Sequence, residues 1–350
     1  MKNKILFFGE LAPNIVHGIS LANRLNTDLL KDNFDVEVVE EKSDFKEYGK
    51  RNSSKIKKIF FYAKEIFGIN RRNRYDYFYT VFSLSTFGGL KTLFVMLAYV
   101  LSGKGQVILH IHRGDFEVFY SKNILNAFIS KLVFKMIDKL IVLSKNQKNE
   151  FSNYFQKENI YVVENSLSEE YILDKSAISS SQFLYISNYI KEKGIFELLD
   201  VFWEYDDKCL ECFGGFVNNE DAIRSYECNT IKINGFINGK EKYQKINEID
   251  ALILPSWNEG QPTIILEAMM MGTVVLTTKV GLIGELLGDE HPFYFEPRDV
   301  ESLRECVERF VSYESKSELS QKLKKVYFEK YAKDVHKQKL LKVFEKECKR

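Results

Sequence analysis

Short runs of apolar residues alternate along the chain with longer amphipathic segments. This alternation is typical of parallel sheets whose strands are joined by crossover helices. The runs that we interpret as strands lie at residues 5–8, 36–39, 77–81, 107–111, 139–143 and 161–163, and then at 183–187, 210–214, 231–235, 251–254, 274–277 and 292–295. The pattern therefore predicts an α/β protein with two series of strands.

A Ser-rich, charged stretch separates the two series. It runs from Ser166 to Ser181 and has the composition of a linker. Because 350 residues are enough for two domains of ordinary size, we expect two Rossmann-like domains, at 1–165 and 182–333, that face each other across a cleft. Residues 334–350 are rich in Lys, Glu and Leu, and predict a C-terminal helix that can pack back on the first domain.

The overall charge is balanced, with 50 Lys and Arg against 49 Asp and Glu, so nothing in it indicates a nucleic-acid partner. One segment departs from this balance, because residues 46–75 hold ten Lys and Arg against two Glu. Within it, Ile56, Phe60, Ala63 and Phe67 form one helical stripe. Either this stripe packs on the first sheet and the lysines are its solvated face, or the helix lies on an anionic membrane surface.

Two further features bear on location. The first apolar run leads straight into Gly9 without the form of a signal peptide, and the longest run, Leu93 to Leu101, falls well short of the roughly 20 residues of a membrane span. Five cysteines in an unexported chain suggest reduced thiols, and the CxxC of Cys209 and Cys212 lacks the partners of a zinc site. We therefore expect a cytoplasmic protein, either free or peripheral on the inner face of the plasma membrane.

Residues 250–272 hold the clearest candidate site. A buried strand ends in a Pro-Ser turn, a polar loop follows, and a helix begins with Thr263 near its N-cap and stops at Gly272. A helix N-terminus outside the carboxyl end of a strand is where phosphorylated ligands bind in α/β sheets. Glu259 and Glu267 flank the loop, and carboxylates accept hydrogen bonds from paired sugar hydroxyls. The passage predicts a site for sugars joined by a diphosphate.

The same passage resembles the signature of a known family. Residues 255–269 read Pro-Ser-Trp-Asn-Glu-Gly-Gln-Pro-Thr-Ile-Ile-Leu-Glu-Ala-Met, which is similar to Pro-Ser-x-x-Glu-Gly-x-Pro-x-x-x-x-Glu-Ala-Met of glycosyltransferase family four, a retaining group with the GT-B fold. Other family segments follow in order at 13–20, 110–114, 163–165 and 186–194, and Gly281 and Glu285 continue the pattern. The resemblance thus runs from the N-terminal loop to about residue 287.

The resemblance implies a role for each residue of the donor site. Glu267 would bind the ribose hydroxyls of the nucleotide, Glu259 would orient the donor sugar, and Lys193 would neutralise the leaving diphosphate. The other implied contacts to sugar or phosphate are Gly260, Gln261, Pro262, Thr263 and Gly18.

One position departs from the family pattern. Asn188 stands where the family has an Arg that binds the diphosphate. An Asn lacks the charge and the two-pronged geometry of Arg, so stabilisation of the leaving group is weaker here or is compensated elsewhere. Lys191 and Arg113 are either the compensating cations or ordinary surface charges.

Three histidines are candidates in the first domain. His112 follows the fourth strand in the setting of the family's His-x-His-Gly, and we expect it to contact the donor sugar or a phosphate. His110 lies behind it if the strand continues that far, because side chains two apart share a face. His17, in the loop after the first strand, contacts acceptor or phosphate, or only caps the loop.

The resemblance implies a metal-independent, cofactor-free enzyme that retains the anomeric configuration. It would move a hexose-type sugar from a UDP- or GDP-sugar to a cell-surface polysaccharide acceptor, expected to be lipid-linked. One alternative, suggested by Asn188, is a sugar-nucleotide-binding protein of the same fold without turnover. The other is an NAD-dependent oxidoreductase, which fits the sheets but needs a Gly-x-Gly-x-x-Gly that the loop from Gly9 to Gly18 lacks.

Overall fold

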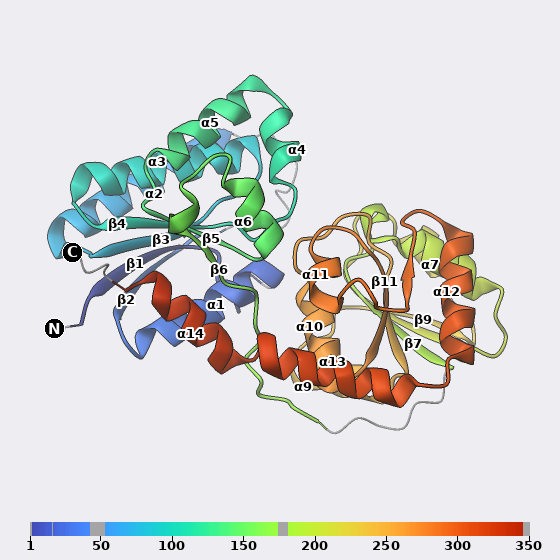
Figure 1. The fold of residues 1–350 in the computed structure, drawn as a ribbon. Helices are drawn as coiled ribbons and strands as arrows, with labels where there is room; N and C mark the ends of the chain where they lie inside the picture. Colours follow the sequence, from blue (N-terminus) through green and yellow to red (C-terminus); the bar gives the residue numbers. More distant parts are fainter. Residues whose placement is uncertain (1, 16, 43–52, 174–180, 346–350) are drawn as a thin grey trace. The chain divides into compact units, whose positions relative to one another are not determined.

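The computed structural model describes residues 2–15, 17–42, 53–173 and 181–345. The chain divides into two compact units, shown in Figure 1. Unit 1 comprises Met1–Ser166 together with Asp334–Arg350, and unit 2 comprises Leu167–Lys333. Leu167 is buried in the core of unit 2, so this unit begins earlier than the expected residue 182, while residues 174–180 of the expected linker lie outside the described part of the chain.

Unit 1 alternates strands and helices in the expected order. Its elements are β1 (Lys4–Gly9), α1 (Gly18–Lys31), β2 (Asp35–Glu40), α2 (Ser53–Asn73), β3 (Tyr77–Val81), α3 (Thr86–Ser102), β4 (Gln106–His110), α4 (Phe116–Ser121), α5 (Ile124–Phe134), β5 (Lys139–Val142), α6 (Lys145–Phe151), η2 (Lys157–Asn159), β6 (Ile160–Val162) and α14 (Lys333–Val343). The six strands form one parallel sheet in the order β2-β1-β3-β4-β5-β6.

The two faces of this sheet carry separate apolar cores. On one face, Leu6, Phe78 and Leu109 of the strands pack with residues of α2, α3, α4 and α5. On the other face, Ile5 and Tyr77 pack with residues of α1 and of α14. This division follows from the alternation of side chains along each strand, which sends consecutive apolar residues to opposite faces.

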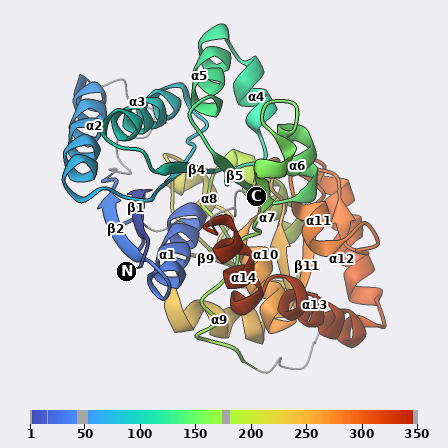
Figure 2. The same cartoon turned by 60° about the vertical axis from the view of Figure 1, so that its left-hand side comes forward.

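The C-terminal segment is anchored in unit 1. The α14 residues Leu340 and Val343 are fully buried there, and the Tyr77 hydroxyl donates to the carbonyl of Phe344 at 2.6 Å. Lys139, at the start of β5, donates from Nζ to the carbonyl of Val343 at 2.6 Å. The helix that the end of the sequence predicts thus lies beside α1 on the sheet of unit 1 (Figure 2).

The helix within the basic segment turns a different face to the sheet from the one that its stripe suggests. Ile59, Tyr62 and Ile66 of α2 are buried, whereas Ile56 is exposed and Phe60 is 59% exposed. The interpretation that the stripe of Ile56, Phe60, Ala63 and Phe67 packs on the sheet is therefore wrong for its N-terminal half. Lys46, Lys50 and Arg51 of the same segment lie outside the described residues.

Unit 2 is a second six-stranded parallel sheet with helices on both faces. Its elements are β7 (Gln182–Ile186), η3 (Lys191–Lys193), α7 (Ile195–Trp203), β8 (Cys209–Phe213), α8 (Glu220–Arg224), β9 (Ile231–Asn234), α9 (Gly239–Glu248), β10 (Ala251–Leu254), α10 (Thr263–Met271), β11 (Val274–Thr278), α11 (Ile283–Leu287), β12 (Tyr294–Phe295), α12 (Val300–Ser312) and α13 (Lys316–Lys330).

The strand order of unit 2 fixes where a ligand would bind. The order is β12-β11-β10-β7-β8-β9, so the chain moves outward from β7 on one side and then returns to place β10 on its other side. The loops after β7 and β10 therefore leave the same edge of the sheet at the point where the direction of winding reverses. Open α/β sheets bind their ligands outside the carboxyl ends of the strands at this switch point.

Candidate functional site

The loop after β10 and the helix that follows it form the centre of the candidate site in unit 2. The loop runs from Pro255 to Pro262, and α10 begins at Thr263. The helix begins at Thr263 as expected, but Pro262 is the N-cap residue and no side chain caps the helix. Gly272 ends the helix in the left-handed conformation that its position suggests, with φ of 76°.

Glu259 and Lys193 form an ion pair at the switch point. Lys193 Nζ donates to Glu259 Oε1 at 2.6 Å, and the hydroxyl of Ser256 donates to the same oxygen at 2.7 Å. Ser256 is fully buried and the Glu259 side chain is only 10% exposed, so water screens this pair weakly. The structure thus brings together two residues that lie 66 positions apart, one after β7 and one after β10.

Two glycines with positive φ hold the loop from both sides. Gly194, with φ of 69°, packs against the carbonyl of Pro255, and Gly281, with φ of 56°, packs against the carbonyl of Glu259. Two backbone hydrogen bonds accompany these contacts, from Trp257 to the carbonyl of Glu192 and from Leu282 to the carbonyl of Gly260. The backbone around Glu259 is therefore fixed by its neighbours.

Glu267 lies inside α10 with 2% of its surface exposed. Its Oε1 accepts from Lys242 Nζ of α9 at 2.7 Å, while its Oε2 has no hydrogen-bond partner within the part of the chain that the structure describes. A buried carboxylate needs such a cation, because an unpaired buried charge is strongly destabilising. Lys242 is absent from our sequence-based site, and no signal in the motif points to it, since its contact with Glu267 depends on how α9 packs against α10.

Asn188 and the nearby cations lie in the loop after β7. The carbonyl of Asn188 accepts from the Tyr185 hydroxyl at 3.0 Å. Lys191 Nζ lies 5.7 Å from the centre of the Trp257 ring, and the guanidinium of Arg298 lies 4.3 Å from the same centre. Lys191 is thus placed against an aromatic ring, a favourable contact for a cation.

The histidine pair of unit 1 is buried at the end of β4. His110 and His112 point the same way, with ring centres 3.8 Å apart. His110 Nδ1 lies 2.8 Å from the hydroxyl of Tyr79, and the amide of Asn26 bridges this hydroxyl (2.9 Å) and His336 Nε2 (2.6 Å). A buried polar chain therefore connects α14 with the two histidines of the His-x-His segment.

Burial keeps these rings neutral. It lowers the pKa of His112 to about 3 against a weaker opposing effect of Asn165, and it lowers the pKa of His336 to about 4. Burial, with the neighbouring His112 and His336, also holds the pKa of His110 well below its usual value. Near neutral pH these side chains act as hydrogen-bonding groups without charge.

Acidification is expected to destabilise unit 1 through these histidines. A His that is neutral when folded takes up a proton on unfolding, so its contribution is complete above the unfolded pKa of about 6.5 and is lost as the pH falls towards the folded pKa, by up to about 1.4 kcal/mol per pH unit. His336→Gln should therefore show a shallower fall in melting temperature than wild type between pH 6.5 and 4.5. Between pH 6.5 and 8 the difference between the two proteins should stay constant. Parallel curves down to pH 4.5 would contradict this reasoning.

The remaining predicted residues of unit 1 lie in two places. His17 caps α1: its Nδ1 accepts from the Ser20 amide at 3.3 Å, so its Nε2 carries the proton and donates to Glu10 at 2.8 Å. Gly18 is the first residue of that helix. Arg113 is exposed and forms an ion pair with Asp115, with Nε 2.8 Å from Oδ1. Of the two readings of His17, the structure shows the capping one.

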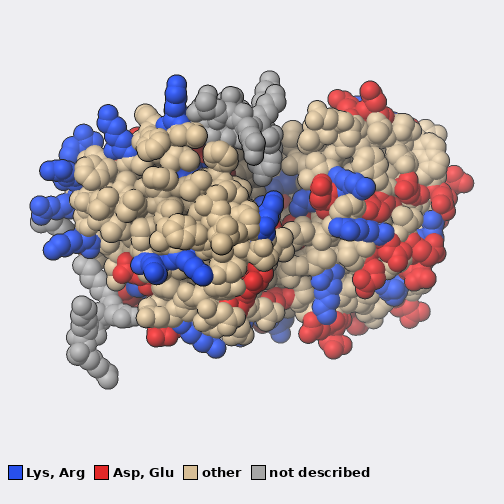
Figure 3. All heavy atoms as spheres, turned by 90° about the horizontal axis from the view of Figure 1, so that it is seen from above, with Lys and Arg blue, Asp and Glu red and all other residues tan. Residues whose placement is uncertain are grey.

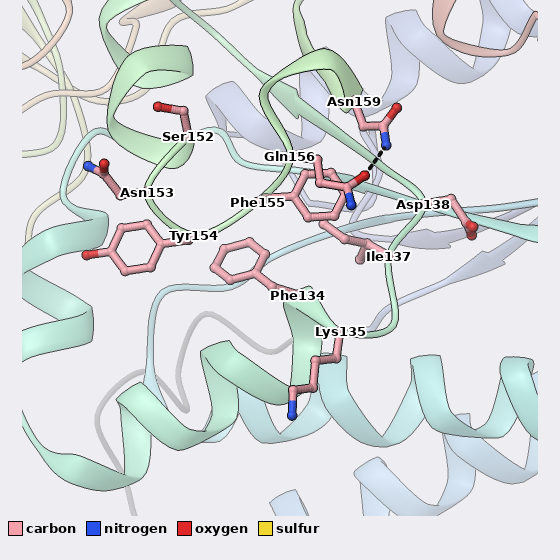
Figure 4. A pocket seen from close by; sticks show the side chains of 10 residues that line it. All are labelled: Phe134, Lys135, Ile137, Asp138, Ser152, Asn153, Tyr154, Phe155, Gln156 and Asn159. Carbon is pink, nitrogen blue, oxygen red and sulfur yellow. Dashed lines mark hydrogen bonds between the residues drawn. The ribbon is translucent and has the colours of Figure 1, made fainter.

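A hollow of about 660 Å³ in unit 1 lies apart from all these residues (Figure 4). Phe134 and Phe155 form its apolar floor, and Gln156 and Asn159 at its edge are joined by a hydrogen bond of 3.1 Å. Its acidic residue, Asp138, accepts from the backbone amide of Val107. We assign it no role.

Among the described residues, no group of three or more His, Cys, Asp or Glu side chains is arranged to hold a metal ion.

Comparison with known proteins finds a family match within unit 2. Residues 173–329 match the model of the family described as glycosyl transferases group 1. TuaC of Bacillus subtilis (strain 168), assigned provisionally as a teichuronic acid biosynthesis glycosyltransferase, is 26% identical over 36% of this chain and 32% of its own. The glycosyltransferase MJ1178 of Methanocaldococcus jannaschii, itself uncharacterised, is 23% identical over 52% of this chain and 51% of its own. The matched regions thus span 32% and 51% of the lengths of these two curated relatives.

Solved structures extend the similarity of fold to the whole chain. Sucrose-phosphate synthase from Thermosynechococcus elongatus superposes with a TM-score of 0.80 over 98% of both chains, at 14% identity. The lipopolysaccharide outer core galactosyltransferase WaaB gives 0.69 over 97% of this chain and 99% of its own, also at 14% identity. The fold class that the strand pattern predicts is therefore confirmed. Residues 173–329 are thus similar to the glycosyl transferases group 1 family, and the chain as a whole has the two-domain GT-B fold.

Proposed function

We propose that the protein transfers a hexose-type sugar from a nucleoside diphosphate sugar to a glycan acceptor. In this reaction the bond from the anomeric carbon to the diphosphate oxygen breaks, a bond to an acceptor hydroxyl oxygen forms, and the hydroxyl proton is released. The observation that carries the proposal is the Lys193–Glu259 pair at the switch point of unit 2, in which Glu259 belongs to the loop that has the complete family signature. It places a cation and a carboxylate where a phosphorylated ligand binds in such sheets.

The pair suggests how the donor is received. A diphosphate carries more negative charge than one carboxylate, so Lys193 would turn from Glu259 to the phosphates and stabilise the charge that develops as they leave. Glu259, released from Lys193 but still bonded to Ser256, could then accept hydrogen bonds from the hydroxyls of the donor sugar. The Lys193–Glu259 ion pair would therefore exist in the donor-free protein and would break when a donor molecule binds.

Glu267 would bind the nucleotide. Its Oε1 is held by Lys242, while Oε2 has lone pairs that no described residue uses. Two hydroxyls of a ribose match a carboxylate in geometry and supply donors to it. The structure of TarM from S. aureus, similar in fold with a TM-score of 0.63 over 81% of this chain and 59% of its own, was determined with UDP, which supports a UDP- or GDP-sugar as donor here.

The role of His112, the retention of configuration and the absence of a metal are proposed from the family resemblance. We assign His112 a contact with the donor sugar or phosphate, with His110 and Asn165 as neighbours that position it. Retention of configuration, by attack of the acceptor on the face from which the diphosphate leaves, suits a site in which Glu259 and Glu267 are both paired with lysines. The positive charge that the leaving group requires comes from Lys193, without a metal.

The acceptor is proposed to be a lipid-linked, cell-surface polysaccharide at the inner face of the plasma membrane. The names of TuaC and WaaB associate those two proteins with teichuronic acid and with lipopolysaccharide. Among the described residues, no helix is both long enough and apolar enough to cross a bilayer. The excess of positive charge in residues 46–75 would attract the protein to anionic lipid.

Nucleotide binding is the first test. UDP or GDP at about 100 times its Kd should stabilise the folded protein by about 2.7 kcal/mol and raise the melting temperature by several degrees. Glu267→Gln should lose most of this shift, because a neutral amide accepts weakly from ribose hydroxyls. Glu248→Gln, an exposed change on the neighbouring helix α9, is the matched control and should keep it. Each variant is compared with its own ligand-free melting temperature, since Glu267→Gln also removes the charge that Lys242 pairs with.

The outcomes separate the alternatives. A shift with NAD but with neither UDP nor GDP would contradict the glycosyltransferase proposal. A nucleotide shift without any release of UDP or GDP from its sugar in the presence of acceptor lipid would indicate a binding protein without turnover.

A further inference from the structure

The outer surface of four helices in unit 1 carries a concentration of exposed apolar side chains. Of eighteen large apolar side chains that are exposed in the described residues, twelve lie on α2, α3, α4 and α5. The most prominent are Phe60, Phe61, Leu97, Leu101, Ile124 and Phe128, which together define what we call the apolar face. Ile124 is 90% exposed and Leu101 is 70% exposed.

These side chains are not part of the folded core. The same helices bury their inner sides, with Tyr62, Met96 and Ile129 packed against the sheet. Phe60 of α2 and Phe94 of α3 contact each other on the outside, with ring centres 5.8 Å apart. The exposed apolar surface is thus continuous from α2 to α3, and connected apolar surface marks an interaction site more often than scattered residues do.

The charges on these four helices indicate the kind of partner that the apolar face would bind. The four helices hold eight Lys and Arg against two acidic residues, Glu65 and Glu117. Glu117 accepts from the Tyr154 hydroxyl at 2.7 Å. In the view of Figure 3, Lys and Arg gather at the border of a broad uncharged surface on the part of the image that unit 1 occupies. A second copy of the chain would bring two basic borders together, whereas an anionic bilayer offers both an apolar interior and opposite charge.

We propose that the apolar face is a bilayer-insertion surface, in which Ile124, Phe128 and Leu101 enter the boundary between headgroups and acyl chains while the basic border binds anionic headgroups. The inference deepens the proposed function, on which it rests for the lipid-linked acceptor. It moves the membrane contact from the basic segment alone to a layer that includes α3 and the α4–α5 hairpin, where apolar burial adds to electrostatic attraction.

Binding to vesicles tests the proposal. The full chain should sediment with vesicles of phosphatidylcholine and phosphatidylglycerol, and much less with phosphatidylcholine alone. The double variant Ile124→Ser, Phe128→Ser should lower the partition coefficient by at least about tenfold, because each change removes apolar area that leaves water on binding. Trp203→Ser, an exposed aromatic position on α7 of unit 2, is the matched control and should leave the coefficient unchanged. Lys57→Glu with Lys64→Glu should weaken binding mainly at low salt.

Three results would overturn the proposal. One is no binding of the wild type to anionic vesicles, and another is equal binding of the wild type and the Ile124→Ser, Phe128→Ser variant. The third is a dimer in lipid-free solution, seen by light scattering, that this double variant dissociates, because the occupant would then be a second copy. The nucleotide-dependent rise in melting temperature, measured on the same preparations, separates failure of this inference from failure of the proposed function, since neither Ile124 nor Phe128 belongs to the donor site.

Discussion

Lys193→Ala is expected to lower kcat by about 10²- to 10³-fold, the usual effect of removing a group that stabilises charge in the transition state. Lys193 is the cation bonded to Glu259, and Asn188 supplies no charge at the place where the family has an Arg. The diphosphate would then leave without its main counter-charge. The measurement is release of UDP or GDP from the matching sugar nucleotide with acceptor lipid present.

A matched control lies two residues away. Lys191→Ala removes the same charge from the same short helix, but Lys191 lies against the Trp257 ring, so the change should cost less than about threefold in kcat. Lys193→Arg should restore part of the activity, because it keeps the charge but not the geometry. If Lys191→Ala and Lys193→Ala lost activity equally while both kept the wild-type melting temperature, the role assigned to Lys193 would be wrong.

The strands could be predicted from the sequence because the pattern of apolar residues that indicates a strand is local. In β1, the run from Ile5 to Phe8 is apolar at every position, as a strand covered on both faces must be. Each of the twelve apolar runs corresponds to a strand of the structure, with ends that differ by at most two residues. The loop around Glu259 could be predicted equally well, because its signature is contained in fifteen consecutive residues.

The ion-pair and hydrogen-bond partners of the site residues could not be predicted from the sequence, because they depend on contacts between distant segments. Lys242 pairs with Glu267 across two helices, and nothing in the sequence near Lys242 distinguishes it from the other lysines of α9. The polar chain from His336 to His110 passes through Asn26, which lies 310 positions from His336. In α2 the choice between two apolar stripes was made by packing against the sheet, since both stripes satisfy helical spacing.

Gly281→Ala is expected to abolish most activity although residue 281 carries no reactive group. A Cβ at this position would lie 1.8 Å from the carbonyl oxygen of Glu259, and the φ of 56° disfavours any residue with a side chain by roughly 1–2 kcal/mol. The backbone of Glu259 must therefore move, which separates its carboxylate from Lys193 and Ser256. A displacement of about 1 Å at a reacting group can cost about 10²-fold in rate, so kcat should fall at least that far.

Two comparisons show whether Gly281→Ala acts through Glu259. Gly235→Ala, where a Cβ meets nothing within 4 Å, should keep both activity and melting temperature. In Gly281→Ala the rise in melting temperature with UDP or GDP should persist, because Glu267, the proposed ribose-binding residue, is held by Lys242 of α9 and does not depend on the backbone of Glu259. Activity lost together with the nucleotide shift would mean that the whole donor site had collapsed, whereas wild-type activity would show that the close contact between Gly281 and Glu259 has no part in catalysis.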